Sequence, residues 1–164
     1  NHPTGSNSPR TILVVDDDDS NRLLCATSLK KAGYHVLEAA GSSEAMNHYT
    51  ASSTPIDLLL TDLFLPPPDF QLSSVKNRYP RVNGHDLVPQ ILSLKNELHV
   101  LFMSSHAMSH LASQGIMIEP ERFLPKPFSV EQLLARVAAA LATPPIRRDS
   151  TATQIPAKNV QWVN

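Results

Sequence analysis

Residues Ile56–Pro66 have the sequence Ile-Asp-Leu-Leu-Leu-Thr-Asp-Leu-Phe-Leu-Pro, and the rest of the predicted fold is arranged around them. The leucines from Leu58 to Leu60 carry no polar break, which is typical of a strand covered on both faces of a sheet. We expect the strand to end near Asp62, because Pro66 disfavours a regular continuation. A carboxylate at the C-terminal end of a central parallel strand lies where open α/β sheets bind ligands. The alternative is that Asp62 only caps a turn.

Length and composition indicate one globular domain. The chain has 164 residues, enough for one domain and too few for two good cores. Apolar residues make up 41% and aromatic residues 5%, so the core must be aliphatic. The net charge of −1 gives no reason to expect a nucleic acid or an anionic membrane surface as a partner. The single cysteine, Cys25, is expected to be a small core residue, and it fits a protein of the reducing cytoplasm.

Apolar runs and helical spacings alternate along the chain. Besides the opening stretch, strands are expected over Thr11–Val15, Tyr34–Ala39, His99–Met103 and Arg122–Leu124. Helices are expected from Asp19 or Ser20 to Gly33, from Gly41 or Ser42 to about Thr50, over His85–Lys95, over Ala107–Gln114, and from Ser129 to Ala142. This alternation predicts an α/β fold with a single doubly wound, five-stranded parallel sheet and five helices.

Composition also sets the expected boundaries of the domain. Residues 1–10 are predicted to be a flexible N-terminal linker, residues 11–142 the folded domain, and residues 143–164 a flexible C-terminal tail. Between the third strand and the third helix, residues 67–83 have no sustained period and form an extended loop.

Four of the five predicted strands end on polar residues that suit one site. Asp16 and Asp17 follow the first strand, Asp62 the third, Ser104 the fourth and Lys126 the fifth. The carboxyl ends of parallel strands meet at one edge of a sheet, so we expect these side chains to converge.

These residue types suggest the chemistry of the site. Clustered carboxylates repel one another and need a cation to stay ionised, and oxygen ligands favour Mg²⁺. The metal and Lys126 would neutralise the oxygens of an incoming phosphoryl group, Ser104 would donate a hydrogen bond to it, and a carboxylate would be the nucleophile.

Five segments in order resemble the receiver domain of two-component response regulators, which has a flavodoxin-like fold. They are Ile12–Asp17, Asp57–Pro66, Asn83–Gly84, Val100–Ser105 and Phe123–Phe128. The resemblance extends from about Arg10 to Ala142. The sequences of Leu101–Ala107 and Phe123–Phe128 are most similar to those of receiver domains attached to hybrid sensor histidine kinases.

The resemblance implies that Asp62 is a phosphoacceptor. It would take a phosphoryl group from a histidine kinase or a histidine phosphotransfer protein, in a signalling domain that catalyses only its own phosphorylation. Asp16 and Asp17 would bind Mg²⁺ together with Asp62 and the backbone carbonyl of Phe64. Lys126 would contact the phosphoryl group.

The resemblance also implies a conformational switch. Ser104 would occupy the switch hydroxyl position, and Phe123 would be the aromatic residue whose rotamer follows it. The Lys126–Pro127 peptide bond is expected to be cis. The face around Met108–Gly115 and Glu131–Leu141 would be the output surface or a homodimer contact.

Two features depart from the family pattern. The loop over residues 67–83 is an insert beside Asp62, which would shield the site, contact a partner, or be a plain surface loop. Phe64 is apolar and cannot position a hydrolytic water, which favours a long-lived phosphoryl group. His106, two residues past Ser104, either takes over that role or only faces solvent.

Two other functions fit parts of the sequence. Asp16 and Asp18 fit the nucleophile motif of an aspartate-based phosphatase of the haloacid dehalogenase type, but this hypothesis leaves Asp62 without a role. A receiver-like docking module that is never phosphorylated is the second. In the run Asp16–Asp19, the last two acids are expected to face solvent or to lie at the N-terminus of a helix.

Overall fold

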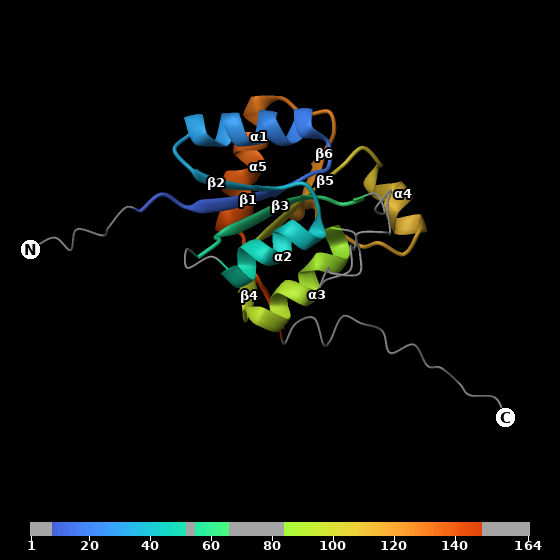
Figure 1. Cartoon of the computed structure of the whole chain (residues 1–164). Coiled ribbons are helices and arrows are strands. Elements are labelled where there is room, and N and C mark those ends of the chain that lie inside the picture. The colour runs from blue at the N-terminus through green and yellow to red at the C-terminus, as the bar shows by residue number, and fades with distance from the viewer. Residues whose placement is uncertain (1–7, 52–54, 66–83, 149–164) are drawn as a thin grey trace, which may run out of the picture.

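The computed structural model describes residues 8–51, 55–65 and 84–148 (Figure 1). The predicted insert over residues 67–83 lies outside the described residues. So do residues 1–7 of the predicted linker and residues 149–164 of the predicted tail.

The strands of the central sheet are β1 (Thr11–Val15), β2 (His35–Ala39), β3 (Leu58–Asp62), β5 (Val100–Ser104) and β6 (Phe123–Pro125). They lie in the order β2-β1-β3-β5-β6 and every neighbouring pair is parallel, as predicted. The chain moves from β1 outward to β2 and then returns to the other side of β1 to form β3. The carboxyl ends of β1 and β3 therefore flank the point where the strand order reverses, which is where such sheets bind ligands.

Helices cover both faces of this sheet (Figure 1). The helices α1 (Asp19–Lys31) and α5 (Val130–Ala142) lie on one face, and α2 (Ser42–Ala51) and α3 (Gly84–Leu94) lie on the other. The short helix α4 (Met108–Ser113) follows β5 and buries Leu111 with the α2–α3 side of the core. No helix within the described ranges combines the length and the apolar character that crossing a bilayer requires.

The three leucines of β3, Leu58–Leu60, pack into the apolar clusters on both faces of the sheet. Leu58 and Leu60 pack with Cys25 in the cluster under α1 and α5, whereas Leu59 packs in the cluster under α2 and α3. Successive side chains of a strand point to opposite faces, so an unbroken apolar run is what a sheet covered on both sides requires. Cys25 is a core residue, as predicted, and burial raises the pKa of its thiol to about 12.

Helix ends agree with the sequence in part. Gly33 follows α1 with a φ of 98°, and Ser129 and Gln132 form the predicted capping box at the start of α5. The predicted cap of α1 was wrong by one or two residues: Asp18, not Asp19 or Ser20, accepts hydrogen bonds from the backbone amides of Ser20 and Asn21. A run of four acids offers several competing N-caps, and the sequence alone does not choose among them.

Two predicted strands are shifted. The segment around His99 divides into β4 (Glu97–Leu98) and β5, and Arg122 closes a 3₁₀ turn over Pro120–Arg122 before β6 begins. Pro120 lies in the first turn of that short helix, where a missing amide proton does no harm.

The chain does not leave the domain at the end of α5. Residues 143–148 were expected to belong to a flexible tail, but Ile146–Arg147 forms strand β7, antiparallel to β4. The guanidinium of buried Arg122 donates to the Pro144 carbonyl at 2.6 Å. The guanidinium of Arg148 donates to the carbonyls of Leu92 and Ser93 at 2.7 and 3.0 Å. These two carbonyls belong to the last turn of α3, so Arg148 satisfies acceptors that have no partner within a helix.

Replacing Arg148 with Ala should therefore lower the free energy of unfolding. We expect a loss of about 1 kcal/mol, because two charge-assisted hydrogen bonds at a partly exposed helix end are removed. Arg147→Ala is the control, since Arg147 makes an exposed ion pair with Glu97 and such pairs contribute roughly 0–1 kcal/mol. Urea unfolding of both variants measures the difference, and equal stability of the two would contradict the capping role of Arg148.

Candidate functional site

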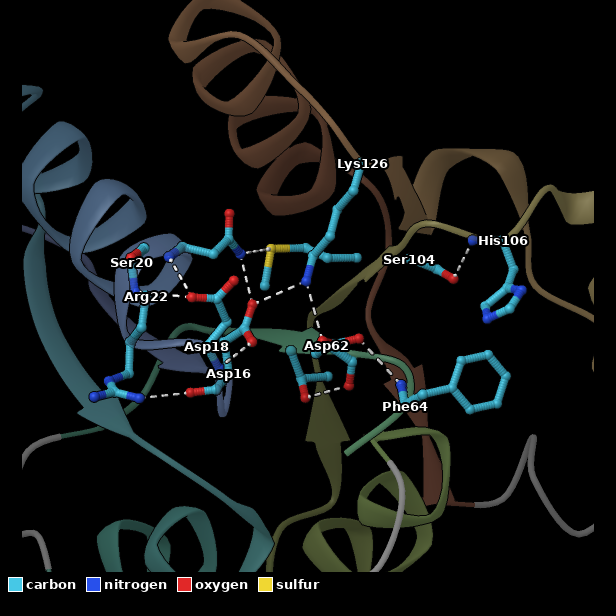
Figure 2. A network of polar contacts seen from close by, with 12 residues as sticks. Asp16, Asp18, Ser20, Arg22, Asp62, Phe64, Ser104, His106 and Lys126 are labelled. Atoms are coloured by element: carbon cyan, nitrogen blue, oxygen red, sulfur yellow. Dashed lines mark hydrogen bonds and ion pairs between the residues drawn. The ribbon is translucent and has the colours of Figure 1, made fainter. Parts of the chain in front are cut away.

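The structure brings the polar residues predicted for the site to one edge of the sheet, and Figure 2 shows four of them: Asp16, Asp62, Ser104 and Lys126. Asp16 and Asp17 directly follow β1, and Asp62 is the last residue of β3. Ser104 is the last residue of β5, and Lys126 directly follows β6. The arrangement follows from the topology, because every strand of the sheet runs in the same direction and ends at the same edge.

Three carboxylates form a cluster there. One oxygen each of Asp16, Asp17 and Asp62 lies within 4.8 Å of the other two. Asp16 is fully buried, Asp62 is half-buried and Asp17 is exposed. These three carboxylates could hold a metal ion, and an all-oxygen ligand set of this kind favours a hard cation.

Lys126 supplies positive charge to this cluster. Its Nζ lies 3.0 Å from Oδ2 of Asp16 and 3.0 Å from Oδ2 of Asp62, so a single ammonium group bridges two carboxylates. Its backbone amide donates to the Ser104 carbonyl at 2.8 Å, and the Lys126–Pro127 peptide bond is cis, as expected. The lysine is thus fixed at both its backbone and its side chain.

The pKa values of the bridged pair reflect burial and charge together. Burial raises the pKa of Asp62, and the hydrogen bond and the positive charge of Lys126 offset this only in part, because the charge of Asp16 acts in the same direction as burial. Burial, the largest single cause, would lower the pKa of Lys126, but its hydrogen bonds to Asp16 and Asp62 and the negative charges of these two residues together outweigh burial, and the pKa is raised. One lysine therefore does not fully compensate the carboxylates, and the cluster favours a further cation.

The other oxygen of Asp62 faces the chain that leaves β3. Oδ1 accepts a hydrogen bond from the backbone amide of Phe64 at 3.1 Å. The Phe64 ring meets His106 edge-on, with centroids 5.1 Å apart and planes at 81°, and His106 stacks on His110 at 5.4 Å. The exposed His106 ring therefore lies against Phe64 at the rim of the site (Figure 2).

Ser104 is buried beside this rim. Its Oγ accepts a hydrogen bond from the backbone amide of His106 at 3.0 Å, so the hydroxyl proton stays available for another acceptor. Phe123 is 5% exposed and packs in the apolar cluster under α2 and α3. Phe123 is thus a core residue in this structure, three residues before the site lysine.

Two residues at the start of α1 escaped the sequence analysis. The side-chain amide of Asn21 donates to Oδ2 of Asp16 at 2.5 Å, and the Arg22 guanidinium donates to the backbone carbonyl of Asp16 at 2.7 Å. Both contacts depend on where α1 begins. With the helix capped at Asp18, its first turn faces the end of β1. Predicting these two contacts from the sequence would have required knowing that Asp18 is the cap.

Gly84, which the sequence singled out only as part of the Asn83–Gly84 segment, marks where α3 meets the site. Its amide donates to the Leu63 carbonyl at 3.1 Å. A Cβ at this position would lie 2.0 Å from the carbonyl oxygen of Asp62 and 2.8 Å from Oγ1 of Thr61. Only glycine lets the start of α3 approach the end of β3 this closely.

Known proteins are similar to this chain in sequence and in structure. The sequence model of the response regulator receiver domain family matches residues 12–138. A DNA-binding transcriptional regulator NtrC of Azospirillum brasilense is 29% identical over 84% of this chain and 26% of its own length. The response regulator MprA of Mycobacterium ulcerans is 31% identical over 88% of this chain and 55% of its own length. The crystal structure of the receiver domain from the hybrid histidine kinase CckA superposes with a TM-score of 0.58, at 29% identity, over 80% of this chain and 98% of that one.

The matched proteins differ in their overall organisation. The chain spans between 26% and 55% of the length of the two curated relatives named above. They are transcriptional and response regulators, whereas the CckA domain comes from a hybrid kinase. The specific resemblance to hybrid-kinase receivers therefore stays a prediction.

A methyl group at residue 84 should disturb the site. Gly84→Ala forces the backbone of β3 and α3 apart, and we expect a loss of about 1–3 kcal/mol in the free energy of unfolding, as is typical of overpacking. Gly115→Ala is the control, because Gly115 has open space around it but a φ of 81°, and so reports backbone strain alone. Chemical shifts of the Asp62 and Leu63 amides should move in Gly84→Ala and not in Gly115→Ala. Unchanged shifts in Gly84→Ala would contradict the close approach.

The raised pKa of Asp62 predicts how stability depends on pH. The folded state binds the Asp62 proton more tightly than the unfolded state, whose pKa is near 3.8. The contribution of Asp62 to stability is therefore present at low pH and is lost as pH rises from 3.8 through the raised value. Asp62→Asn should become progressively more stable than the native chain across that window, as measured by urea unfolding from pH 4 to pH 8. Glu121→Gln, an exposed carboxyl outside the cluster, is the control, and parallel profiles for the native chain and Asp62→Asn would contradict the assignment.

Proposed function

This chain belongs to the response regulator receiver domain family, and on that premise we propose that it accepts a phosphoryl group on Asp62 and thereby switches a protein-interaction surface. The observation that carries the proposal is the Lys126 ammonium group, which lies 3.0 Å from both Asp16 and Asp62 at the edge where three carboxylates converge. A nucleophilic carboxylate, a fixed cation and a cation-binding cluster are the groups that phosphoryl transfer to an aspartate requires.

The transfer step uses Asp62 as the nucleophile. A carboxylate oxygen of Asp62 forms a bond to phosphorus while the bond between phosphorus and the donor breaks, and the donor keeps the electron pair. In a phosphohistidine donor that bond is P–N, and the pair remains on the imidazole nitrogen. Asp62 has to be ionised to attack, and its raised pKa explains why a cation beside it promotes the reactive form.

We assign the cation site to Asp16, Asp17 and Asp62 together with the backbone carbonyl of Phe64. Mg²⁺ bound there would neutralise charge on the transferred oxygens. Asp17 is exposed, so the cluster opens to solvent on its side and admits a hydrated ion. The three carboxylates, and not a His or Cys group, make the site one for a hard cation.

Lys126 and Ser104 would bind the oxygens of the phosphoryl group once it is on Asp62. Lys126 leaves its shared position between two carboxylates and pairs with a phosphoryl oxygen, while the Ser104 hydroxyl donates to another. The hydroxyl proton is available for this because Ser104 acts as an acceptor in its hydrogen bond with the His106 amide. The alternative nucleophile, Asp16, is fully buried and already accepts hydrogen bonds from Asp18, Asn21 and Lys126, which argues against a phosphatase that uses it.

We further propose that movement at Ser104 alters the packing of Phe123 and, through it, the face formed by α4 and α5. Phe123 pairs with Phe102 in adjacent strands and packs in the same apolar cluster as Leu111 of α4. A change at the end of β5 therefore reaches α4 through contiguous packing. This face would bind the output partner or a second copy of the chain, and a histidine kinase or a phosphotransfer protein would supply the phosphoryl group.

Intact-mass measurement after incubation with Mg²⁺ and a small acyl phosphate tests the proposal. The native chain should gain one phosphoryl unit, and Asp62→Asn should gain none, because the nucleophile is lost. Asp86→Asn, which removes an exposed carboxyl of α3, is the matched control and should be modified like the native chain. No gain in the native chain, or a gain that survives Asp62→Asn, would overturn Asp62 as the acceptor and favour a docking module that is never phosphorylated.

A further inference from the structure

We propose that Asn21 is a positioning residue for the cation site: its neutral side-chain amide fixes the carboxylate of Asp16 and keeps it hydrogen-bonded when Lys126 moves to a phosphoryl group. The inference rests on the proposed function. Asn21 is not part of the acidic cluster and acts only through its contact with Asp16.

The start of α1 aims Asn21 at the site. Asp18 caps the helix, and its Oδ1 accepts from the backbone amides of Ser20 and Asn21 at 2.9 and 3.4 Å. This cap makes Asn21, which is half-buried, the third residue of α1, in the turn beside the end of β1. Its Nδ2 then lies 2.5 Å from Oδ2 of Asp16 and 3.8 Å from the sulfur of Met103.

The hydrogen bonds of Asp16 show why this contact matters. Asp16 has no exposed surface, so it depends on protein donors. Oδ1 accepts from the backbone amide of Asp18 at 2.9 Å, and Oδ2 accepts from both Asn21 and Lys126. A carboxylate offers roughly four lone-pair directions, so these three donors leave about one for a cation.

Lys126 is the donor that has to leave. It is shared between Asp16 and Asp62, and a phosphoryl group on Asp62 adds negative oxygens that attract it. Once Lys126 has moved, Asn21 is the side-chain donor that still holds Oδ2 of Asp16 among the described residues. A buried carboxylate that loses every side-chain donor is destabilised, and Asn21 prevents this.

The chemical type of residue 21 fits this role. An amide donates a hydrogen bond without carrying charge, so it orients Asp16 and does not compete with a cation for the carboxylates. A lysine here would compete, and an aspartate would add a fourth negative charge to the cluster. Without the amide, Lys126 would be the sole side-chain donor to Oδ2 of Asp16 within the described chain. Asp16 would then depend on Lys126, which competes with an incoming cation for this carboxylate.

Calorimetric titration of the full chain with Mg²⁺ alone tests this inference. Asn21→Leu keeps the branching of the side chain and removes the donor, and Asn21→Ala removes the donor with a residue of high helix propensity. Both variants should bind Mg²⁺ about tenfold more weakly than the native chain, the change expected for losing one charge-assisted hydrogen bond. Ser20→Ala, which alters an exposed neighbour in the same turn, should bind Mg²⁺ like the native chain.

The outcomes separate this inference from the proposed function. Circular dichroism establishes that each variant is folded, so a purely structural role would change stability but leave the Mg²⁺ affinity of the folded chain unchanged. If the native chain binds Mg²⁺ and becomes phosphorylated while both Asn21 variants bind Mg²⁺ equally tightly, the positioning role of Asn21 is wrong and the proposed function stands. If the native chain itself binds no Mg²⁺, both are overturned.

Discussion

The bridge from Lys126 to Asp16 and Asp62 is the interaction on which the site depends. Three carboxylate oxygens within 4.8 Å of one another repel strongly, and a buried member such as Asp16 has no water to relieve it. The sheet order explains how one lysine reaches both acids: β6 lies beyond β5, and a long side chain spans that strand to meet the ends of β3 and β1. The cluster remains undercompensated, and its three carboxylates could hold a metal ion.

The surrounding fold fixes the positions of these charges. The cap at Asp18 sets the start of α1, and from there Asn21 and Arg22 contact the side chain and the backbone carbonyl of Asp16. On the other side, Gly84 lets α3 begin against the carbonyl of Asp62. Two apolar layers hold the strands beneath, so the backbone at the edge cannot relax away from the repulsion.

The sequence predicted the sheet and the convergence of the site because both follow from unbroken apolar runs. Leu58–Leu60 can only be buried on two faces, and the polar residue after each such strand must lie at the shared edge. The start of α1 was not predictable in detail, because four adjacent acids offer equivalent caps, and Asn21 was missed with it. Residues 143–148 were assigned to a tail because their prolines and arginines are typical of loops. Arg122 and Arg148 hold this segment and α3 through backbone carbonyls, which leave no pattern in the sequence.

The hydrogen bond from the His106 amide to Ser104 determines which new contacts the Ser104 hydroxyl can make. Ser104 accepts this bond, so its hydroxyl can donate to a new acceptor before the bond to the His106 amide is broken. His106 also lies against Phe64, whose amide holds Oδ1 of Asp62. The segments after β3 and β5 are therefore joined by the ring contact between Phe64 and His106 at the rim and by the Leu63 amide, which donates to the Met103 carbonyl at 2.8 Å. Because the two segments beside Asp62 already contact each other, a displacement of one would also move the other.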